Sequence, residues 1–396
     1  MRVLIHDHSG HPFQAELSRE LARRGHDVTH SYVAGYVSGK GRLTALPGET
    51  ITYVGIGGEA KIEQRAYAKR LWREVTRGFE LVRHVRQVDP DIVMLSNVQI
   101  PTMVIFAAVM AVLRRPWILW HQDVYAVALR KLAGTKLSPR FRIVAWLFWI
   151  AERWCARRAA AVVVIADSFV RVHQQWGTAD KVTVIPNWAP VDELTPRERD
   201  NDWARAQGLA ERPRLVYSGT LGLKHNPELL PQLAAAVQEL GTKVDLVVVT
   251  EGAAEPVLRS GAESLGVDLT LLPFQPYEQL PEVLGAADVL VVLLEADAGA
   301  FSVPSKTLSY LCAGRPVLGF VPAENLAAHL IEQTGGCVLA PEPSAVPAGA
   351  RWVVDLLADP ERAASIGEAS RALAEKEFEL SGCADRFEAI LGASAR

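Results

Sequence analysis

A lysine at the start of a helix is the residue of this sequence that points most directly to chemistry. Lys306 follows Pro304 and Ser305. The segment comes after an apolar run at 289–294 and a loop of small residues at 296–300. Pro304 near the first turn and Ser305 near the cap are typical of a helix start, which offers backbone N–H groups and a positive dipole end to an anion. The segment therefore predicts a phosphate site, with a plain helix after a loop as the alternative.

A histidine in the N-terminal half also follows a predicted strand. His121 comes directly after the apolar run Trp117–Trp120. Ligands of parallel sheets bind beyond the carboxyl ends of the strands. We therefore predict a ligand-facing loop here, with a purely structural His121 as the alternative. Asp123, two residues further on, is either an acceptor contact or a helix cap.

Four polar residues near the N-terminus raise the question of a metal site. They are His6, Asp7, His8 and His11. Their spacing matches no common zinc motif, and no further ligands are evident in the sequence. We therefore expect no metal here. The dipeptide Ser9-Gly10 is better interpreted as a loop that lets a ligand approach the backbone closely.

Two series of strands and helices must position these residues. The first series predicts helices at 12–24 and 61–87 and strands at 2–6, 27–31, 92–95, 117–120, 161–165 and 182–185. A polar stretch at 192–212 interrupts the pattern, which restarts with strands at 215–217, 244–249, 269–272, 289–294 and 317–320. Apolar strands that alternate with helices are typical of parallel sheets covered on both faces. The sequence therefore predicts an α/β protein of two doubly wound, Rossmann-like domains that face each other across a cleft.

The composition agrees with two globular domains. The chain has 396 residues, of which 49% are hydrophobic and 22% are charged, so it is too long for one ordinary domain. Its four cysteines form no CxxC pair, which argues against a disulfide scaffold or a zinc site and favours the reducing cytoplasm. No signal peptide is visible, and no run reaches the roughly 20 apolar residues of a membrane span.

Charge is distributed unevenly along the chain. Residues 1–190 contain 26 Lys and Arg against 15 Asp and Glu, whereas the remaining residues contain 16 against 30. A basic half suggests contact with an anionic membrane surface or a phosphorylated acceptor, and a merely solvated surface is the alternative. The predicted helix at 61–87 carries a basic stripe that would suit such a membrane contact: Lys61, Arg65, Lys69, Arg70, Arg73 and Arg77. The aromatic and basic stretch 141–158 is interpreted as a core helix with basic ends, with interfacial membrane binding as the alternative.

The run from Pro304 to Val317 resembles the nucleotide-sugar motif of the family-4 glycosyltransferases. It is most similar to the bacterial branch that transfers amino-deoxysugars of the fucosamine type in polysaccharide and O-antigen synthesis. Further segments resemble this family in the same order: Gly10 to Val28, Trp120 to Asp123, Glu152-Arg153, Ala159–Ser168, Val184–Trp188 and Tyr217–Gly222. The resemblance covers nearly the whole chain. It implies a GT-B fold with an acceptor-binding domain at 1–190, a nucleotide-sugar-binding domain at 191–375, and a C-terminal helix at 376–396 that packs back on the first domain.

The resemblance also assigns roles to single residues. It implies that Lys306 and Lys224 neutralise a diphosphate leaving group and that His121 hydrogen-bonds the transferred sugar. Backbone N–H groups from Gly219 to Gly222 and at Ser305 would hold the phosphates. The other donor-binding positions that it implies are Gly10, Thr220, Gly252, Phe274, Gln275, Val303, Pro304 and Ser309.

The sequence departs from the family pattern at three positions, which are Phe301, Ser309 and Thr220. Phe301 and Ser309 stand where the family often has two glutamates, the second of which normally holds the ribose. Thr220 stands where the family usually has an arginine. Ser309 therefore lacks the carboxylate that normally holds the ribose in this family, and Lys224 is the residue expected to supply the missing cation.

The expected function is transfer of a sugar from a nucleotide diphosphate, with UDP favoured, to a lipid-linked glycan with retention of configuration. The nucleotide sugar is a substrate, and neither a cofactor, a metal nor a nucleic acid is expected. A small natural-product acceptor and a nucleotide-sugar epimerase are the alternatives, although the carboxylates and arginines of an epimerase are not evident. A dinucleotide-dependent oxidoreductase would need a GxGxxG motif, which residues 6–11 lack.

Overall fold

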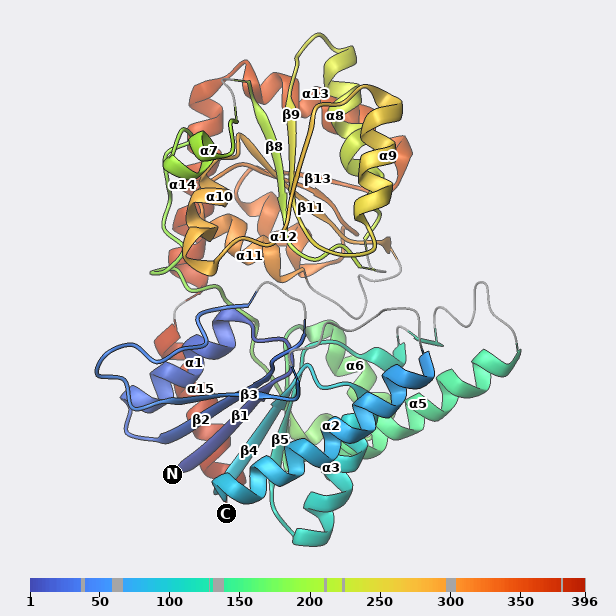
Figure 1. Cartoon of the computed structure of the whole chain (residues 1–396), viewed down its shortest axis with the longest axis vertical. Coiled ribbons are helices and arrows are strands. Elements are labelled where there is room, and N and C mark those ends of the chain that lie inside the picture. Colours follow the sequence, from blue (N-terminus) through green and yellow to red (C-terminus); the bar gives the residue numbers. More distant parts are fainter. Residues whose placement is uncertain are drawn as a thin grey trace. The chain divides into compact units, whose positions relative to one another are not determined.

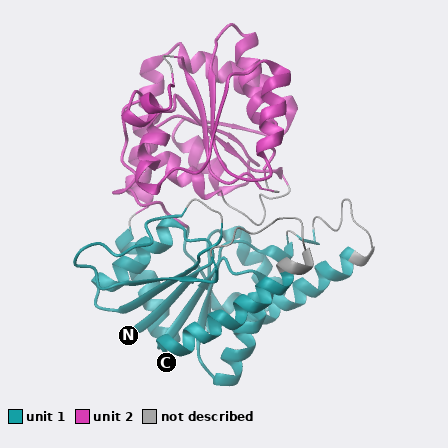
Figure 2. Ribbon diagram, viewed as in Figure 1, with its two compact units in different colours: residues 1–186, 300–302, 380–396 teal, residues 187–299, 303–379 magenta. Residues whose placement is uncertain are grey.

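The computed structural model describes residues 1–36, 40–58, 67–127, 129–130, 139–209, 212–222, 225–296, 304–378 and 380–395. The chain divides into two compact units, which Figure 2 shows in different colours. Unit 1 contains residues 1–186 and 380–396, and unit 2 contains most of residues 187–379. The division falls after Pro186, close to the expected boundary at residue 190.

Unit 1 is built on a parallel sheet of seven strands in the order β3-β2-β1-β4-β5-β6-β7 (Figure 1). The strands are β1 (Arg2–Asp7), β2 (Asp27–Val33), β3 (Thr52–Ile56), β4 (Ile92–Ser96), β5 (Trp117–His121), β6 (Ala161–Val164) and β7 (Val182–Val184). The helices are α1 (Pro12–Arg23), α2 (Tyr67–Val88), α3 (Ile100–Leu113), α5 (Pro139–Arg158), α6 (Asp167–Trp176) and α15 (Leu380–Ser394). The order reverses between β1 and β4, which is where such sheets open a crevice for a ligand.

The C-terminal helix α15 belongs to unit 1 and packs against α1 and β5. The guanidinium of Arg24 lies 2.6 Å from a carboxylate oxygen of Asp385 and 3.0 Å from one of Glu388. The ring of Phe387 packs against that of Trp120, with the two centroids 4.5 Å apart. Apolar packing under a charged rim therefore joins the two ends of the chain within one unit.

Unit 2 repeats the same topology with a parallel sheet of six strands in the order β10-β9-β8-β11-β12-β13. The strands are β8 (Arg214–Ser218), β9 (Asp245–Val249), β10 (Leu269–Leu272), β11 (Val289–Leu293), β12 (Val317–Phe320) and β13 (Cys337–Leu339). The helices are α7 (Asp202–Ala206), α8 (Leu229–Glu239), α9 (Glu255–Leu265), α10 (Leu280–Gly285), α11 (Ser305–Cys312), α12 (Leu326–Gln333), α13 (Val346–Leu357) and α14 (Pro360–Glu377).

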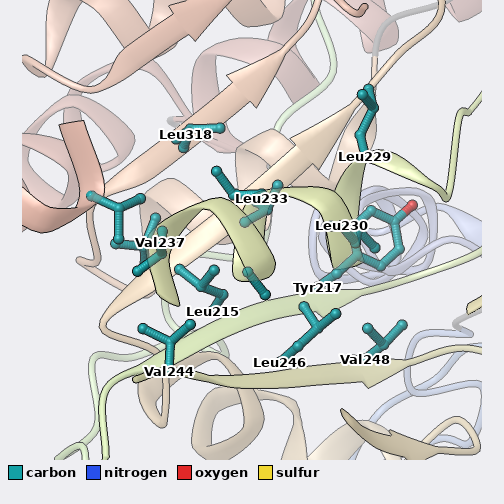
Figure 3. Packing of buried hydrophobic residues seen from close by; sticks show 14 of the residues in the cluster. Leu215, Tyr217, Leu229, Leu230, Leu233, Val237, Val244, Leu246, Val248 and Leu318 are labelled. Carbon is teal, nitrogen blue, oxygen red and sulfur yellow. The ribbon is translucent and has the colours of Figure 1, made fainter. Parts of the chain in front are cut away.

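The core of unit 2 lies between its sheet and the helices that cover it. Figure 3 shows how Leu230, Leu233 and Val237 of α8 pack over Leu215 of β8 and Leu246 of β9. The spacing of three and four residues between these leucines and the valine places them on one face of the helix. The central strands β9 and β11 are buried throughout, because helices cover both faces of a parallel sheet.

The predicted α/β architecture with two Rossmann-like domains is confirmed. The strands β3 and β13 were not predicted from the sequence. β3 lies at the edge of its sheet and is only partly buried, so its sequence lacks a continuous apolar run. β13 has three residues, too few for a pattern to stand out.

Two interpretations of helix surfaces are wrong. The first half of α5 is largely exposed and is not part of the core, since Trp146 and Leu147 lie at the surface. In the basic stripe, Arg77 is buried and its guanidinium bonds Glu74 at 2.6 Å. The burial of Arg77 removes one cation from the predicted stripe, while Lys61 and Arg65 lie outside the described residues.

Candidate functional site

The predicted site residues fall into two groups, one at the carboxyl edge of each sheet. In unit 2 the group surrounds the end of β8, beside the point where the strand order reverses between β8 and β11. In unit 1 it surrounds the ends of β1, β4 and β5. This edge is the usual ligand-binding position of doubly wound sheets.

Gly219 and Lys306 meet at the carboxyl edge of unit 2. Gly219 follows β8 with a φ of +145°, a conformation that side chains other than glycine rarely adopt. A Cβ atom at Gly219 would lie 2.8 Å from Cε of Lys306. Glycine at this position therefore lets the lysine side chain pass directly over the backbone. Residues 87 positions apart in the sequence, both predicted for the phosphate site, are brought into contact.

Two tyrosines hold this arrangement in place. The Nζ of Lys306 lies 5.2 Å from the ring centroid of Tyr217, within cation–π range. The hydroxyl of Tyr310, one turn after Lys306 on α11, accepts a hydrogen bond from the N–H of Ser218 at 2.8 Å and donates to its carbonyl at 3.1 Å. Burial raises the pKa of Tyr310, so the phenol stays protonated and can keep donating. Tyr310 thus joins α11 to the end of β8.

Helix α11 begins where the sequence predicted a helix start, but its N-cap lies one residue earlier than expected. Pro304 occupies the N-cap position in an extended conformation, and Ser305 is the first helical residue. Among the described residues, no side chain caps this end of the helix. The first N–H groups of α11 are therefore available to an anion beside Lys306. Ser309 is half-buried in the second turn.

The remaining residues of unit 2 that the sequence predicts for a donor site have contacts of their own. The carbonyl of Thr220 accepts from Tyr217 Oη at 3.0 Å, the N–H of Gly222 donates to Nδ1 of His225, and that of Gly252 donates to Glu255. Phe274 is half-buried after β10, and the amide oxygen of Gln275 accepts from Nε1 of Trp203 at 3.1 Å. Lys224 and Val303 lie outside the described residues.

His121 ends β5 and lies in a buried chain of hydrogen bonds. Its Nε2 lies 3.1 Å from Oε1 of Glu152 on α5, and its Nδ1 lies 3.1 Å from Nε2 of His173 on α6. The Nδ1 of His173 in turn lies 2.9 Å from Oγ1 of Thr178. Only 4% of the His121 surface is exposed. With both ring nitrogens already engaged, the structural alternative is favoured over a direct hydrogen bond from this ring to a sugar.

The direction of this chain follows from its acidic end. An ionised carboxylate only accepts hydrogen bonds, so Nε2 of His121 donates to Glu152. In the neutral tautomer, Nδ1 of His121 then accepts from Nε2 of His173. Burial, followed by the neighbouring His121, lowers the pKa of His173 to about 3. His173 is therefore neutral at physiological pH, which this direction requires.

Glu152 also fixes the loop after β5 and is a residue that the sequence analysis did not select for a role. Its Oε1 accepts from the N–H of Tyr125 at 3.2 Å, and its Oε2 accepts from the N–H of Ala126 at 2.7 Å. Glu152 thus binds the first N–H groups of the helical turn that follows Asp123. The signal that could have found it is a lone glutamate in an otherwise basic and apolar helix.

Asn97 is a second residue that the sequence analysis missed. It follows β4 with a φ of +58°. Its side chain is buried, and its Nδ2 has no hydrogen-bond partner among the described residues. Asn97 lines a small cavity of about 10 Å³ together with His121, Gln122, Asp123 and Tyr125. A buried donor without a partner costs about 1–3 kcal/mol, so this position would favour a ligand oxygen or a bound water.

The residues near the N-terminus serve the loop after β1. The carboxylate of Asp7 accepts from the N–H groups of Ser9 and His11, and Nδ1 of His6 lies 3.0 Å from Oγ of Ser31. Gly10 has a φ of +78°, and a Cβ there would lie 2.9 Å from Cδ1 of Leu43. Packing within unit 1 thus already requires a glycine at this position. Among the described residues, no three metal-ligating side chains gather in one place.

Two family models together match most of the chain. Residues 11–188 match the glycosyl transferase 4-like domain, and residues 200–373 match the glycosyl transferases group 1. The chain therefore belongs to the glycosyltransferases that combine these two domains.

Individual relatives and solved structures agree with this membership. Over 61% of the length of this chain, it is 24% identical to the alpha-D-kanosaminyltransferase of Streptomyces kanamyceticus. It is 25% identical to the putative colanic acid biosynthesis glycosyl transferase WcaI of Escherichia coli K12 over 43% of its length. These matches span 62% and 42% of the relatives' own lengths.

A solved structure covers more of the chain. The Anabaena protein HepE, in complex with UDP-glucose, superposes on 99% of this chain and 100% of its own with a TM-score of 0.69 and 17% identity. This likeness shows the shared fold, which is of the GT-B type.

Proposed function

We propose that this protein is a retaining glycosyltransferase that moves a sugar from a UDP-sugar to a lipid-linked glycan in cell-surface polysaccharide synthesis. The observation that supports the donor half of the proposal is the contact between Lys306 and Gly219 beside the start of α11. A cation, a glycine that permits close approach, and a helix N-terminus are the features that bind a diphosphate. UDP is favoured because the structurally similar Anabaena protein is solved with UDP-glucose.

The proposed mechanism gives each of these groups a role in the departure of the diphosphate. As the bond between the sugar C1 and the phosphate oxygen breaks, Lys306 and the N–H groups of α11 stabilise the charge that develops on the phosphate. Lys224 would supply a second cation. The acceptor hydroxyl attacks the same face of C1, and its proton passes to the departing phosphate oxygen. This route needs no protein nucleophile and keeps the anomeric configuration.

Unit 1 is proposed to bind the acceptor at the ends of β4 and β5. Asn97, Gln122 and Asp123 line a cavity of about 10 Å³, which has room for about one water-sized group, so it would take a single sugar hydroxyl. The loop that carries Gln122 and Asp123 is held by Glu152 and by the His121 chain. In this proposal His121 positions the loop and does not itself contact the sugar.

The identity of the acceptor rests on charge and on the relatives. The net basic character of residues 1–190 suits a lipid-linked acceptor at an anionic membrane, and the relative from Escherichia coli is named for colanic acid biosynthesis. A small natural-product acceptor is the second candidate, because the other relative is named as a kanosaminyltransferase. Among the described residues, no helix is long and apolar enough to cross a bilayer.

The first test is a melting-temperature panel with UDP, GDP, dTDP, ADP and NAD. A ligand at about 100 times its Kd stabilises the fold by about 2.7 kcal/mol, which is readily measured. We expect UDP to raise the melting temperature more than the other nucleotides. Incubation with a UDP-sugar and an acceptor then gives a product whose anomeric configuration is determined by NMR. A shift with NAD alone, or a product of inverted configuration, would contradict the proposal.

A further inference from the structure

The largest concentration of exposed apolar side chains in this protein lies on three helices of unit 1. Of the large hydrophobic residues that are exposed in the described chain, most belong to α2, α3 and α5. α3 packs against both α2 and α5, and the three helices follow one another along the same side of the sheet (Figure 1). Apolar side chains gathered in this way mark an interaction surface.

Helix α5 contributes the longest part of this surface. Ile143, Trp146, Leu147 and Ile150 are all exposed, and their spacing of three and four residues places them on one face of the helix. Trp146 has 57% of its surface exposed. This outward face is apolar, whereas Ala145 and Glu152 of the same helix are buried in unit 1. Among the residues that the structure describes, this exposed face packs against no other part of unit 1.

Helices α2 and α3 extend the surface. Trp72 and Phe79 lie two turns apart on α2, with 68% and 59% of their surfaces exposed. Val112 at the end of α3 is 83% exposed, and α3 carries no charged residue over its whole length. We call the exposed apolar residues of the three helices the apolar face; they are Leu71, Trp72, Phe79, Val112, Leu113, Ile143, Val144, Trp146, Leu147 and Ile150.

The charges around the apolar face are almost all positive. Arg73 and Arg83 are exposed beside Trp72 and Phe79, and Arg142 is exposed beside Ile143. On the described parts of these three helices, Glu80 is the exposed acidic side chain. Glu74 and Glu152 are buried, and each bonds groups within unit 1. The surroundings of the apolar face therefore attract an anionic partner.

A basic pocket lies where α3 and α5 end. It has a volume of about 310 Å³, and Arg114, Arg115 and Arg158 line it over a floor that includes Met110 and Trp117. Arg115 is paired with Asp89, and Arg158 lies over the ring of Trp154 at 5.3 Å. Arginines above an apolar floor match a phosphate group attached to a hydrocarbon chain.

We propose that the apolar face docks the protein on an anionic phospholipid bilayer. Trp72, Trp146 and the neighbouring aliphatic side chains enter the boundary between headgroups and acyl chains, where tryptophan is favoured. The surrounding arginines bind lipid phosphates, and the pocket at Arg114 and Arg158 holds one headgroup. The inference rests on the proposed function for one point, which is that docking brings the enzyme to a lipid-linked acceptor.

The test is sedimentation of the full-length protein with vesicles in the absence of donor. One set of vesicles contains phosphatidylcholine alone, and the other also contains phosphatidylglycerol. We expect binding to the anionic vesicles and about tenfold weaker binding after the double substitution Trp146→Gln and Ile150→Gln. The matched control changes two exposed apolar residues of α9 in unit 2, Val257→Gln and Leu265→Gln, and should bind as the wild type does. Both variants alter the surface, so their melting temperatures should equal that of the wild type.

Three results would overturn the inference. The first is equal vesicle binding by the wild type and the α5 variant. The second is equal binding to neutral and anionic vesicles. The third is a dimer in solution that the α5 variant abolishes, without vesicle binding by either protein, since the apolar face would then serve a second copy of the chain. A UDP titration on the same samples separates the two proposals, because vesicle binding without UDP binding contradicts only the proposed function, and UDP binding without vesicle binding contradicts only the docking surface.

Discussion

The two units share one strand order and differ in what they have at the carboxyl edge of the sheet. In unit 1 the polar groups there bond one another, as in the chain from Glu152 through His121 to His173. In unit 2 the edge combines Lys306, Gly219 and a helix start that no described side chain caps. The same topology therefore gives two different environments.

Topology therefore determines where a ligand can bind, and the side chains determine which ligand it is. A reversal of strand order opens an edge in both sheets. The cation and helix dipole of unit 2 suit a diphosphate. The edge of unit 1 carries a hydrogen-bonded chain of His121, His173 and Glu152, and polar groups of this kind suit hydroxyl groups.

Acid should destabilise unit 1 before unit 2. Burial is the main cause that lowers the pKa values of His6, His30 and His173 to about 3, below their usual value of 6.5. Below about pH 6.5 the unfolded chain takes up protons that the folded unit does not, so stability falls until about pH 3. Each histidine contributes up to about 1.4 kcal/mol per pH unit. The raised pKa of Asp7 offsets part of this loss at the acidic end.

Hydrogen exchange at pH 7 and pH 5 measures this effect in each unit. Unit 2 provides the internal control, because all three of these histidines belong to unit 1. The contrast is lost if the strands of unit 2 lose protection as early as those of unit 1.

The substitution Glu152→Gln should destabilise unit 1 by about 2–3 kcal/mol. The glutamine carbonyl can still accept one set of hydrogen bonds, but its NH₂ group would face the N–H of Ala126, so two donors would oppose each other. Urea denaturation followed by hydrogen exchange measures the loss. Glu80→Gln, an exposed glutamate of α2, is the matched control and should leave stability unchanged. Equal stability of the two variants would argue that the buried chain does not hold the loop.

The substitution Gly219→Ala should lower kcat/KM for the donor by about tenfold or more. The new Cβ would lie 2.8 Å from Cε of Lys306. The alanine would also have to adopt a φ of +145°, which strains the backbone by about 1–3 kcal/mol. Gly222→Ala is the control in the same loop, since nothing lies within 4 Å of a Cβ there and alanine keeps the N–H group. Similar kcat/KM values for both variants would contradict a role of the close approach between Lys306 and Gly219 in use of the donor.

The substitution Arg24→Ala should have the smallest effect and should destabilise unit 1 by about 0.5–1 kcal/mol. The carboxylates of Asp385 and Glu388 that it pairs with are partly exposed and screened by salt. Hydrogen exchange of α15 at low and high salt is the measurement. A loss of all protection in α15 would show that the charges, and not Phe387 and its apolar neighbours, hold the C-terminal helix.

The sequence predicted the fold because its signals are local, whereas donor binding at the carboxyl edge of unit 2 stays a prediction. β10 and β12 were predicted at their observed bounds, since each is a short run made mostly of apolar residues. Gly219 and Lys306 belong to separate short motifs that each suggest a phosphate. Their contact follows from a topology that the alternation of strands and helices already implied.

The sequence could not predict the partners of His121 or the exposure of α5. Glu152 and His173 lie 31 and 52 residues away from His121, and no local pattern marks such a pairing. An aromatic face such as that of Trp146 has the same sequence pattern whether it meets a sheet or solvent. Only the packing of α5 on its neighbours decides which side of that helix is exposed.

Calorimetric titration of UDP into Lys306→Ala is the decisive test of a diphosphate site at the start of α11. The wild type and the control Lys376→Ala, which changes an exposed lysine of α14, should bind UDP with the same Kd. Lys306→Ala should bind at least about tenfold more weakly, because it loses a charge-assisted contact with the diphosphate. If Lys306→Ala binds UDP as tightly as the wild type does, the donor diphosphate is not held at the start of α11 and the account is wrong.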